Sequence, residues 1–221
     1  AKTFSITVND LAYATPYCPD IIYLNKMNLV LSGDALIDQM LLGWTLDTDD
    51  DASTPLTVTY SIITTDSVFA SDYIWKTLLN GDDDPENNFL LSNNVTPSSA
   101  FQTAVDTIFE LYSEITGITF VQVTESSTQC GDIRIGLNNL VTESGYGVTI
   151  DPLSSAGSGG LDIWINNSNP DLSESSWGAG SIGFHTLIHE IGHTLGLSHP
   201  HDDEDDYMLN SSWDARYYTV L

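Results

Sequence analysis

Alternating hydrophobic and polar positions predict several short strands along the chain. Residues 56–63 alternate and are rich in β-branched side chains, which is typical of a strand. Residues 118–123 and 132–138 have the same character, and the second of them places an isoleucine or leucine at every other position. Two shorter strands are predicted at 146–150 and 161–166, where turn residues precede the hydrophobic run.

Two segments have a helical period instead. The first helix is predicted to begin with Thr96 as N-cap and Pro97 at the first helical position, and to end at Gly117. Its hydrophobic stripe comprises Phe101, Val105, Ile108, Phe109, Tyr112 and Ile115. The second helix is predicted to follow Ser181 as its cap. The side chains expected to face the core are Ile182, Leu187, Ile188, Ile191 and Leu195. Strands with one long helix among them and a second helix near the end predict an α+β fold.

The second helix carries histidines at the spacing of a metal site. His189 and His193 are four residues apart, so their imidazoles lie on one face of the helix, one turn apart. Glu190 is rotated about 100° from the first of them and can face a metal-bound water. Gly196 allows the chain to leave the helix in a conformation that is costly for other residues, and the turn returns His199 as a third ligand.

Three imidazoles and a water are the ligands of an open catalytic zinc site. A buried amphipathic helix that is merely rich in histidine is the alternative. It does not account for three of the five histidines of the chain in this register, with the glutamate and the glycine in place. The sequence therefore predicts a zinc (Zn²⁺) hydrolase, with Glu190 as its general base.

Charge limits the partners that this hydrolase can have. Asp and Glu number 31 against 5 Lys and Arg, which gives a net charge of -26 and excludes nucleic acid and anionic membrane surfaces. No segment is hydrophobic over the length that spans a membrane. Acidic residues gather at 47–51, 82–86 and 202–206, and each cluster fits either a structural calcium (Ca²⁺) loop or a solvated acidic loop. An EF-hand is excluded at the first cluster, because Ala52 stands where that loop requires Gly.

The order of elements and the motif at 189–199 resemble the metzincin clan of zinc peptidases, and the serralysins most of all. The segments that carry this resemblance are 33–38, 41–44, 56–60, 132–136 and the zinc motif with Pro200 after it. The resemblance implies a metzincin-like catalytic domain over residues 33–221, with residues 1–32 as an N-terminal extension. That domain has a twisted mixed sheet with an antiparallel edge strand, one long backing helix and an active-site helix.

The resemblance also implies a function. We expect a secreted, extracellular zinc metalloendopeptidase that acts as a monomer on proteins or peptides, with Glu190 as the base for a zinc-bound water. In metzincins the substrate pairs with an edge strand above the zinc helix, which makes Tyr146, Gly147 and Val148 the predicted substrate-binding residues. The sequence ends at Leu221, and on this resemblance we expect a domain without the zinc-binding tyrosine of serralysins, the last helix of the catalytic domain and the C-terminal β-roll. A latent or inactive peptidase-like binding domain is therefore the alternative.

Two further assignments leave alternatives open. Cys18 and Cys130 predict one disulfide in an exported protein. Residues 15–20 loosely resemble the latency segment of matrixins, in which a cysteine thiol occupies the zinc site, although the spacing differs and favours the disulfide. The methionine that metzincins place beneath the zinc corresponds to Leu221 on the serralysin-like alignment, with Met208 as the matrixin-like rival.

Overall fold

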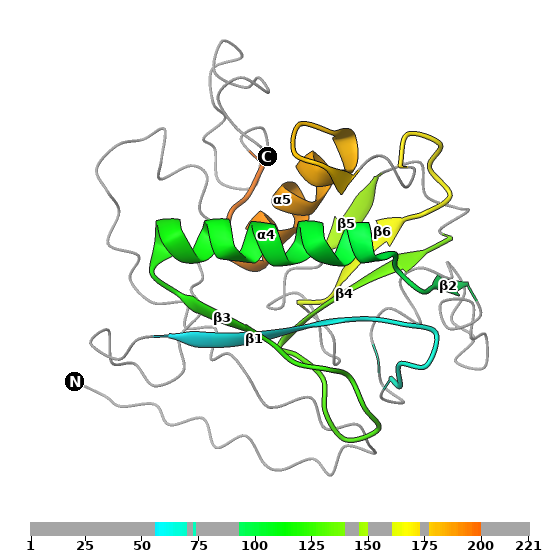
Figure 1. The fold of residues 1–221 in the computed structure, drawn as a ribbon, viewed down its shortest axis with the longest axis horizontal. Coiled ribbons are helices and arrows are strands. Elements are labelled where there is room, and N and C mark those ends of the chain that lie inside the picture. The colour runs from blue at the N-terminus through cyan, green and yellow to red at the C-terminus, as the bar shows by residue number, and fades with distance from the viewer. Residues whose placement is uncertain are drawn as a thin grey trace.

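The computed structural model describes residues 56–69, 73, 93–139, 146–149, 161–172 and 177–199 (Figure 1). Within these residues the chain forms six strands and two helices. No helix among them is both long and apolar enough to cross a membrane. The predicted N-terminal extension at 1–32 lies outside the described residues, so the division of the chain into an extension and a catalytic domain stays a prediction.

The strands form one mixed sheet. Its order is β3-β1-β4-β6-β5, and β2 pairs with β4 off this path. The strands are β1 (Thr57–Ile62), β2 (Asn94–Val95), β3 (Thr119–Gln122), β4 (Ile133–Asn138), β5 (Gly147–Thr149) and β6 (Ile163–Asn166). Strands β3, β1, β4 and β6 run parallel, whereas β5 is antiparallel to β6 and β2 is antiparallel to β4. The predicted α+β fold with an antiparallel edge strand is confirmed.

Each of the five predicted strands is present within two residues of its expected ends. The sixth, β2, was not predicted, because two residues are too short to show a period. Strand β4 is buried along its whole length, including its polar members Arg134 and Asn138. Both faces of the sheet are therefore covered at its centre, as is usual for parallel strands.

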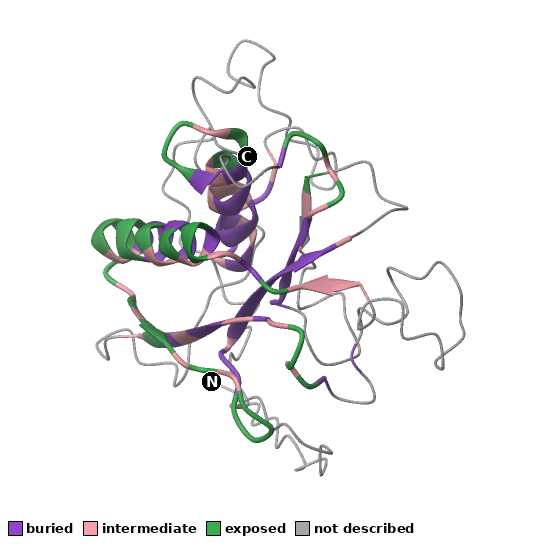
Figure 2. Ribbon diagram, turned by 45° about the vertical axis from the view of Figure 1, so that its right-hand side comes forward, coloured by how far each residue is buried: buried purple, intermediate pink, exposed green. Residues whose placement is uncertain are grey.

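One face of the sheet packs against both helices. Strand side chains at alternate positions, such as Ile133 and Ile135 of β4, join buried residues of the helices in one hydrophobic core. Figure 2 shows the buried residues along the strands and the inward sides of both helices, with the outer side of the long helix exposed. The core therefore holds the two helices in fixed positions against the sheet.

Helix α4 (Ser99–Thr116) is the predicted backing helix, with two corrections. Its N-cap is Ser98 and not Thr96, because the Ser98 hydroxyl accepts the hydrogen bond from the Phe101 N–H, at 3.3 Å. The hydrophobic stripe is buried as far as Tyr112, but Ile115 is 71% exposed. The prediction for Ile115 was wrong because the last turn, 114–117, is exposed on every side, so periodicity continues beyond the packed part of the helix. Gly117 ends the helix at φ 77°, as predicted.

Helix α5 (Ile182–Thr194) carries the histidine motif and is capped by Ser181, as predicted. Leu187 and Ile191 are fully buried, and Ile188 and Leu195 pack against the core with part of their surface exposed; the list of core-facing residues was wrong only for Ile182. Ile182 is 46% exposed because it is the first helical residue, before the buried face of the helix begins at Gly183.

A buried charged network covers the other face of the sheet. Arg134 donates two hydrogen bonds of 2.8 Å to the carboxylate of Glu125. The Arg134 guanidinium also stacks 4.3 Å from the centre of the Phe69 ring. Asp162 lies 4.0 Å from the same guanidinium and accepts a 2.6 Å hydrogen bond from the Tyr73 hydroxyl. The network therefore joins β4 and the residue before β6 to the segments that pack behind the sheet.

Candidate active site

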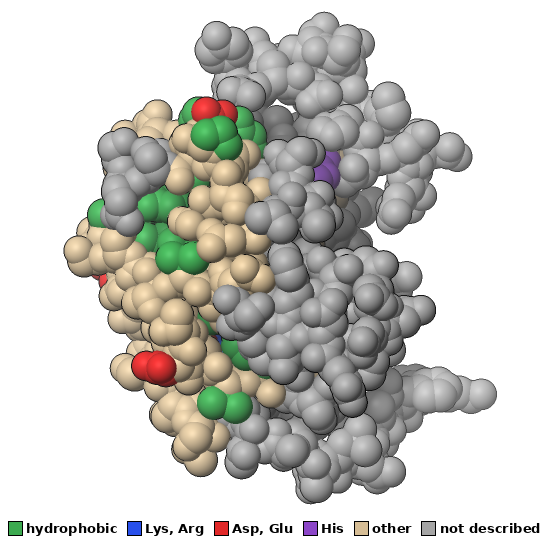
Figure 3. All heavy atoms as spheres, turned by 90° about the vertical axis from the view of Figure 1, so that its right-hand side faces the viewer, with side chains coloured by type: hydrophobic (Ala, Val, Ile, Leu, Met, Phe, Trp, Pro, Cys, Tyr) green, Lys and Arg blue, Asp and Glu red, His purple; other side chains and the backbone are tan. Residues whose placement is uncertain are grey.

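Three histidines converge at the C-terminal end of α5. The Nε2 atom of His193 lies 3.1 Å from that of His189 and 3.2 Å from that of His199. The remaining pair, His189 and His199, is separated by 3.2 Å. The three predicted ligands therefore lie together, each half-buried. Figure 3 shows that histidine atoms, which it does not label by residue, reach one face of the molecule.

The chain after α5 returns His199 to the helix by the predicted turn. Gly196 has a φ of 93°, the left-handed region that favours glycine. The N–H groups of Gly196 and Leu197 donate to carbonyls of the last helical turn, at 3.0 and 3.1 Å. Two residues later the imidazole of His199 faces those of the helix. The expectation that Gly196 permits this exit is confirmed.

The outer hydrogen bond of His193 prepares its ring for a metal. Its Nδ1 lies 2.7 Å from the carbonyl oxygen of Leu197. A carbonyl oxygen can only accept, so Nδ1 carries the proton and Nε2 of the neutral ring keeps its lone pair. Metal-binding histidines usually make this second hydrogen bond, which fixes the ring and its tautomer.

The donor set fits zinc. Three nitrogen atoms separated by 3.1–3.2 Å can all lie at the ~2.0–2.1 Å of a zinc–nitrogen bond from one point. The angles between those bonds would be about 100°, near the tetrahedral value that zinc prefers, with a fourth position open. Lone pairs that converge this closely repel one another unless a cation or a proton lies between them. The geometry therefore supports a zinc site.

Glu190 lies on the same helix and is 6% exposed. Its Oε2 accepts a hydrogen bond of 2.8 Å from the hydroxyl of Thr149 on β5. Burial raises the pKa of Glu190 to about 7, and the hydrogen bond from Thr149 opposes this rise. The carboxylate is thus held in the interior beside the edge strand.

The predicted substrate-binding residues lie at the start of that edge strand. Gly147 and Val148 belong to β5, which is last in the strand order and pairs with β6. Tyr146 comes directly before β5; it is 38% exposed, and its hydroxyl donates to Asp171 at 3.0 Å. Whether these residues bind substrate stays a prediction. Thr149 was not among them, although the period of two along a strand places it on the same face as Gly147.

The remaining site assignments fall mainly outside the described residues. Cys130 is buried, and the described part of the chain contains no free cysteine, but its expected partner Cys18 lies outside that part. The disulfide therefore stays a prediction. Met208 and Leu221 also lie outside the described residues, as do the acidic clusters considered for calcium, so neither assignment is tested.

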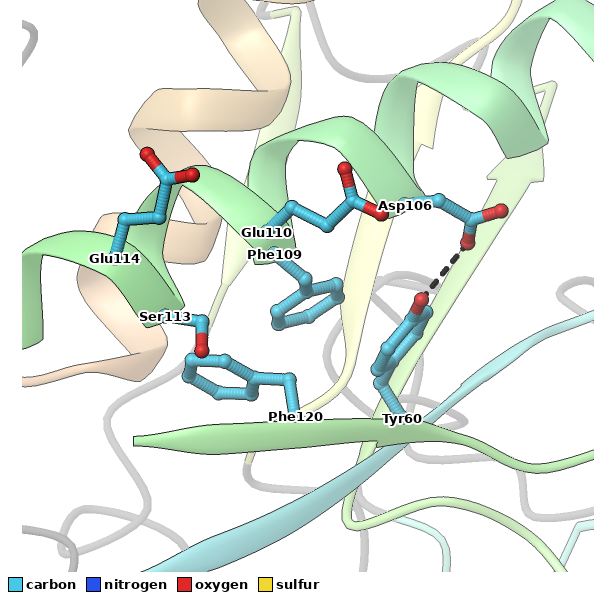
Figure 4. Close-up of a pocket in the computed structure, with 7 residues that line it drawn as sticks. All are labelled: Tyr60, Asp106, Phe109, Glu110, Ser113, Glu114 and Phe120. Carbon is cyan, nitrogen blue, oxygen red and sulfur yellow. Dashed lines mark hydrogen bonds between the residues drawn. The ribbon is translucent and has the colours of Figure 1, made fainter. Parts of the chain in front are cut away.

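A separate pocket of about 360 Å³ lies between α4 and the strands β1 and β3 (Figure 4). Tyr60 lines it, and its hydroxyl donates to Asp106 at 2.9 Å. Burial raises the pKa of Tyr60 above its usual value, and the Asp106 carboxylate raises it further. The pocket residues are Tyr60, Asp106, Phe109, Glu110, Ser113, Glu114 and Phe120, none of which lies on α5 or β5. The pocket is therefore not part of the histidine site.

Two known proteins are similar to this chain, whereas no protein-family model matches it. A serralysin from Photorhabdus sp. (strain Az29) is 28% identical over 58% of this chain. A serralysin from Photorhabdus luminescens is 27% identical over the same share. The match spans only 28% of the length of each relative. This partial similarity supports a serralysin-like zinc protease at the level of the family.

Proposed function

We propose that the chain is a zinc-dependent endopeptidase of the serralysin type, with His189, His193 and His199 as the zinc ligands and Glu190 as the general base. One observation carries the proposal. Three histidine nitrogens, two from α5 and one from the turn after it, converge within 3.2 Å of one another, and Glu190 beside His189 on the helix is a buried carboxylate. The similarity to serralysins supports the same assignment.

The reaction divides between the metal and the carboxylate. Zinc, when bound, supplies Lewis-acid activation of water and of the peptide carbonyl. Glu190 takes a proton from the attacking water and later delivers it to the leaving amine. Glu190 is buried beside β5, so bulk water is excluded from one side of its carboxylate. Few groups other than the attacking water and the leaving amine can therefore exchange a proton with it.

The edge strand is the proposed platform for the substrate. Strand β5 pairs with β6 on one side and is last in the strand order among the described residues. An extended peptide can add to such an edge through backbone hydrogen bonds, and residues 146–148 would make them. Recognition of this kind reads the peptide backbone more than its side chains, so we infer a broad specificity for unfolded proteins and peptides.

The wider setting belongs to the same proposal. We infer a secreted, extracellular monomer from the serralysin-like resemblance, and a Cys18–Cys130 disulfide would persist in such an oxidising compartment. Structural calcium ions bound by the acidic segments would offset part of the net charge of -26. These inferences rest on the serralysin-like resemblance and on the composition.

Substitution of the base tests the proposal. Glu190→Ala should lower the rate of casein hydrolysis by the zinc-loaded chain by about 100-fold or more, because general base catalysis typically contributes 10²–10⁴-fold. The zinc content should stay at one ion per chain, since all three histidines remain. The matched control, His193→Ala, should lose both zinc and activity. A Glu190→Ala variant that keeps more than about a tenth of the wild-type rate would contradict the assigned role.

The same assay separates the alternative function. A latent or inactive binding domain would take up one zinc ion and leave casein intact. Cleavage by the wild-type chain that disappears with zinc chelation and returns with added zinc supports the peptidase. Zinc uptake without cleavage overturns it.

A further inference from the structure

We propose that Thr149, on the edge strand β5, is a positioning residue that holds the carboxylate of Glu190 for proton transfer. This inference rests on the proposed function of Glu190. The Thr149 hydroxyl donates to Glu190 Oε2 at 2.8 Å, and it lies 3.4 Å from the backbone carbonyl oxygen of the same residue. Among the described residues, no other group donates a hydrogen bond to this carboxylate.

The position of the hydroxyl is set by the sheet and not by the helix. Thr149 pairs with Ile163 of β6, a strand that is fully buried. A β-branched side chain has few χ1 rotamers, so a fixed backbone also fixes the hydroxyl. Glu190, in contrast, has three side-chain torsions, and each must be ordered if the carboxylate is to meet a water in one orientation. The hydrogen bond from the strand supplies that order.

The two carboxylate oxygens have different surroundings. Oε2 is held by Thr149. Oε1 faces Gly147, where a Cβ atom would lie 2.9 Å from both Oε1 and the Cγ atom of Glu190. Such contacts are too short for any real side chain, so only glycine leaves room for this rotamer. Gly147 and Thr149 lie on one face of β5, two residues apart, and together they define the orientation of the carboxylate.

This arrangement assigns a role to each oxygen. Oε1, to which no described group donates a hydrogen bond, is the oxygen left to take the proton of the attacking water, while Oε2 keeps its hydrogen bond from Thr149. A variant without the Thr149 hydroxyl keeps the base and the zinc ligands but loses the fixed rotamer. We therefore expect this variant to have a lower kcat, with little change in KM or in zinc content.

Paired substitutions test the role. Thr149→Val preserves the shape and the β-branching and removes only the hydroxyl, whereas Thr149→Ser keeps the hydroxyl and removes a methyl group. In casein-peptide hydrolysis by the zinc-loaded chain, we expect Thr149→Val to lower kcat by about 10- to 100-fold with KM unchanged within about twofold. Thr149→Ser should restore kcat to within about threefold of wild type. Zinc content and melting temperature report on folding in each variant.

A double-mutant cycle identifies the partner. In a Glu190→Gln background, adding Thr149→Val should change the residual rate by less than about twofold, because the base that the hydroxyl positions is already lost. Three results would overturn the inference: a Thr149→Val variant with wild-type kcat, a Thr149→Ser variant as slow as Thr149→Val, or an undiminished effect of Thr149→Val in the Glu190→Gln background. Zinc binding without any cleavage by the wild-type chain overturns the proposed function as well, so the two failures are distinguishable.

Discussion

Asp162 makes the stability of this protein depend on pH in a direction that is unusual for a carboxylate. The side chain is buried behind the sheet, where burial raises its pKa from 3.8 to about 7, against the lowering effect of the nearby Arg134 guanidinium. Glu125 already accepts two hydrogen bonds from that guanidinium. When Asp162 is protonated, the buried network of Arg134, Glu125 and Asp162 is electrically neutral. Because asparagine is neutral at every pH, we predict that Asp162→Asn stabilises the protein at neutral pH.

The magnitude follows from proton linkage. Between about pH 4 and pH 7 the folded chain keeps a proton on Asp162 that the unfolded chain has lost. The stability that this proton provides is complete below about pH 4 and is lost as the pH rises to about 7. A shift of about three pKa units, at about 1.4 kcal/mol per unit, sets an upper limit of ~4 kcal/mol. Asparagine does not titrate, has the same shape, and still offers an oxygen to the Tyr73 hydroxyl.

Urea unfolding of the two chains at several pH values between 4 and 8 measures this effect. The free energy of unfolding of Asp162→Asn minus that of wild type should rise with pH up to about 7, by as much as ~4 kcal/mol, and then level off. Titration of the other groups cancels in the difference. Glu110→Gln, an exposed change on α4, is the control for removing one negative charge. A difference that is constant across this range, or that falls with pH, would refute the reasoning.

Two predictions concern packing. Gly131→Ala should destabilise the protein by about 2–3 kcal/mol in urea unfolding, because the added Cβ would lie within 2.6 Å of the Tyr60 Cα. Gly178→Ala, where a Cβ meets nothing within 4 Å, should change stability by less than about 0.5 kcal/mol. If both substitutions lowered stability equally, the steric explanation for Gly131 would be wrong. Tyr112→Phe should cost about 1 kcal/mol in the same assay, because the tyrosine hydroxyl donates to the Ile188 carbonyl at 2.9 Å and joins α4 to α5. An unchanged midpoint for Tyr112→Phe would show that this link contributes nothing.

The sequence correctly predicts the arrangement of the histidines, because local geometry determines it. His189 and His193 are neighbours on a helix whatever the rest of the chain does, and Gly196 marks the turn that returns His199. The fold class follows in the same way, because each main strand and helix has enough residues to show its own period. A contiguous motif of eleven residues is therefore sufficient to predict that the three histidines come together.

The predictions that failed concern residues whose burial depends on tertiary packing. Ile115 and Ile182 continue a hydrophobic pattern but lie in terminal turns beyond the packed part of their helices. Periodicity identifies the face of a helix and carries no information about where the opposing sheet ends. The burial of Arg134 likewise follows from pairing with Glu125 and Asp162, since an unpaired charge could not occupy that position.

The contact between Thr149 and Glu190 depends on both local strand geometry and tertiary packing. The two residues are 41 positions apart, so no local rule brings them together. Their contact depends on the register of β5 on β6, in which Thr149 pairs with Ile163. A slip of one residue would turn both Gly147 and Thr149 to the opposite face of the strand. The hydroxyl would then leave the carboxylate, and a side chain at 148 would replace the glycine beside it. The three histidines would be unaffected by such a slip, because all of them lie on α5 and its following turn. The proposed metal site therefore depends on one short segment, whereas the orientation of the proposed base depends on how an edge strand is held in the sheet.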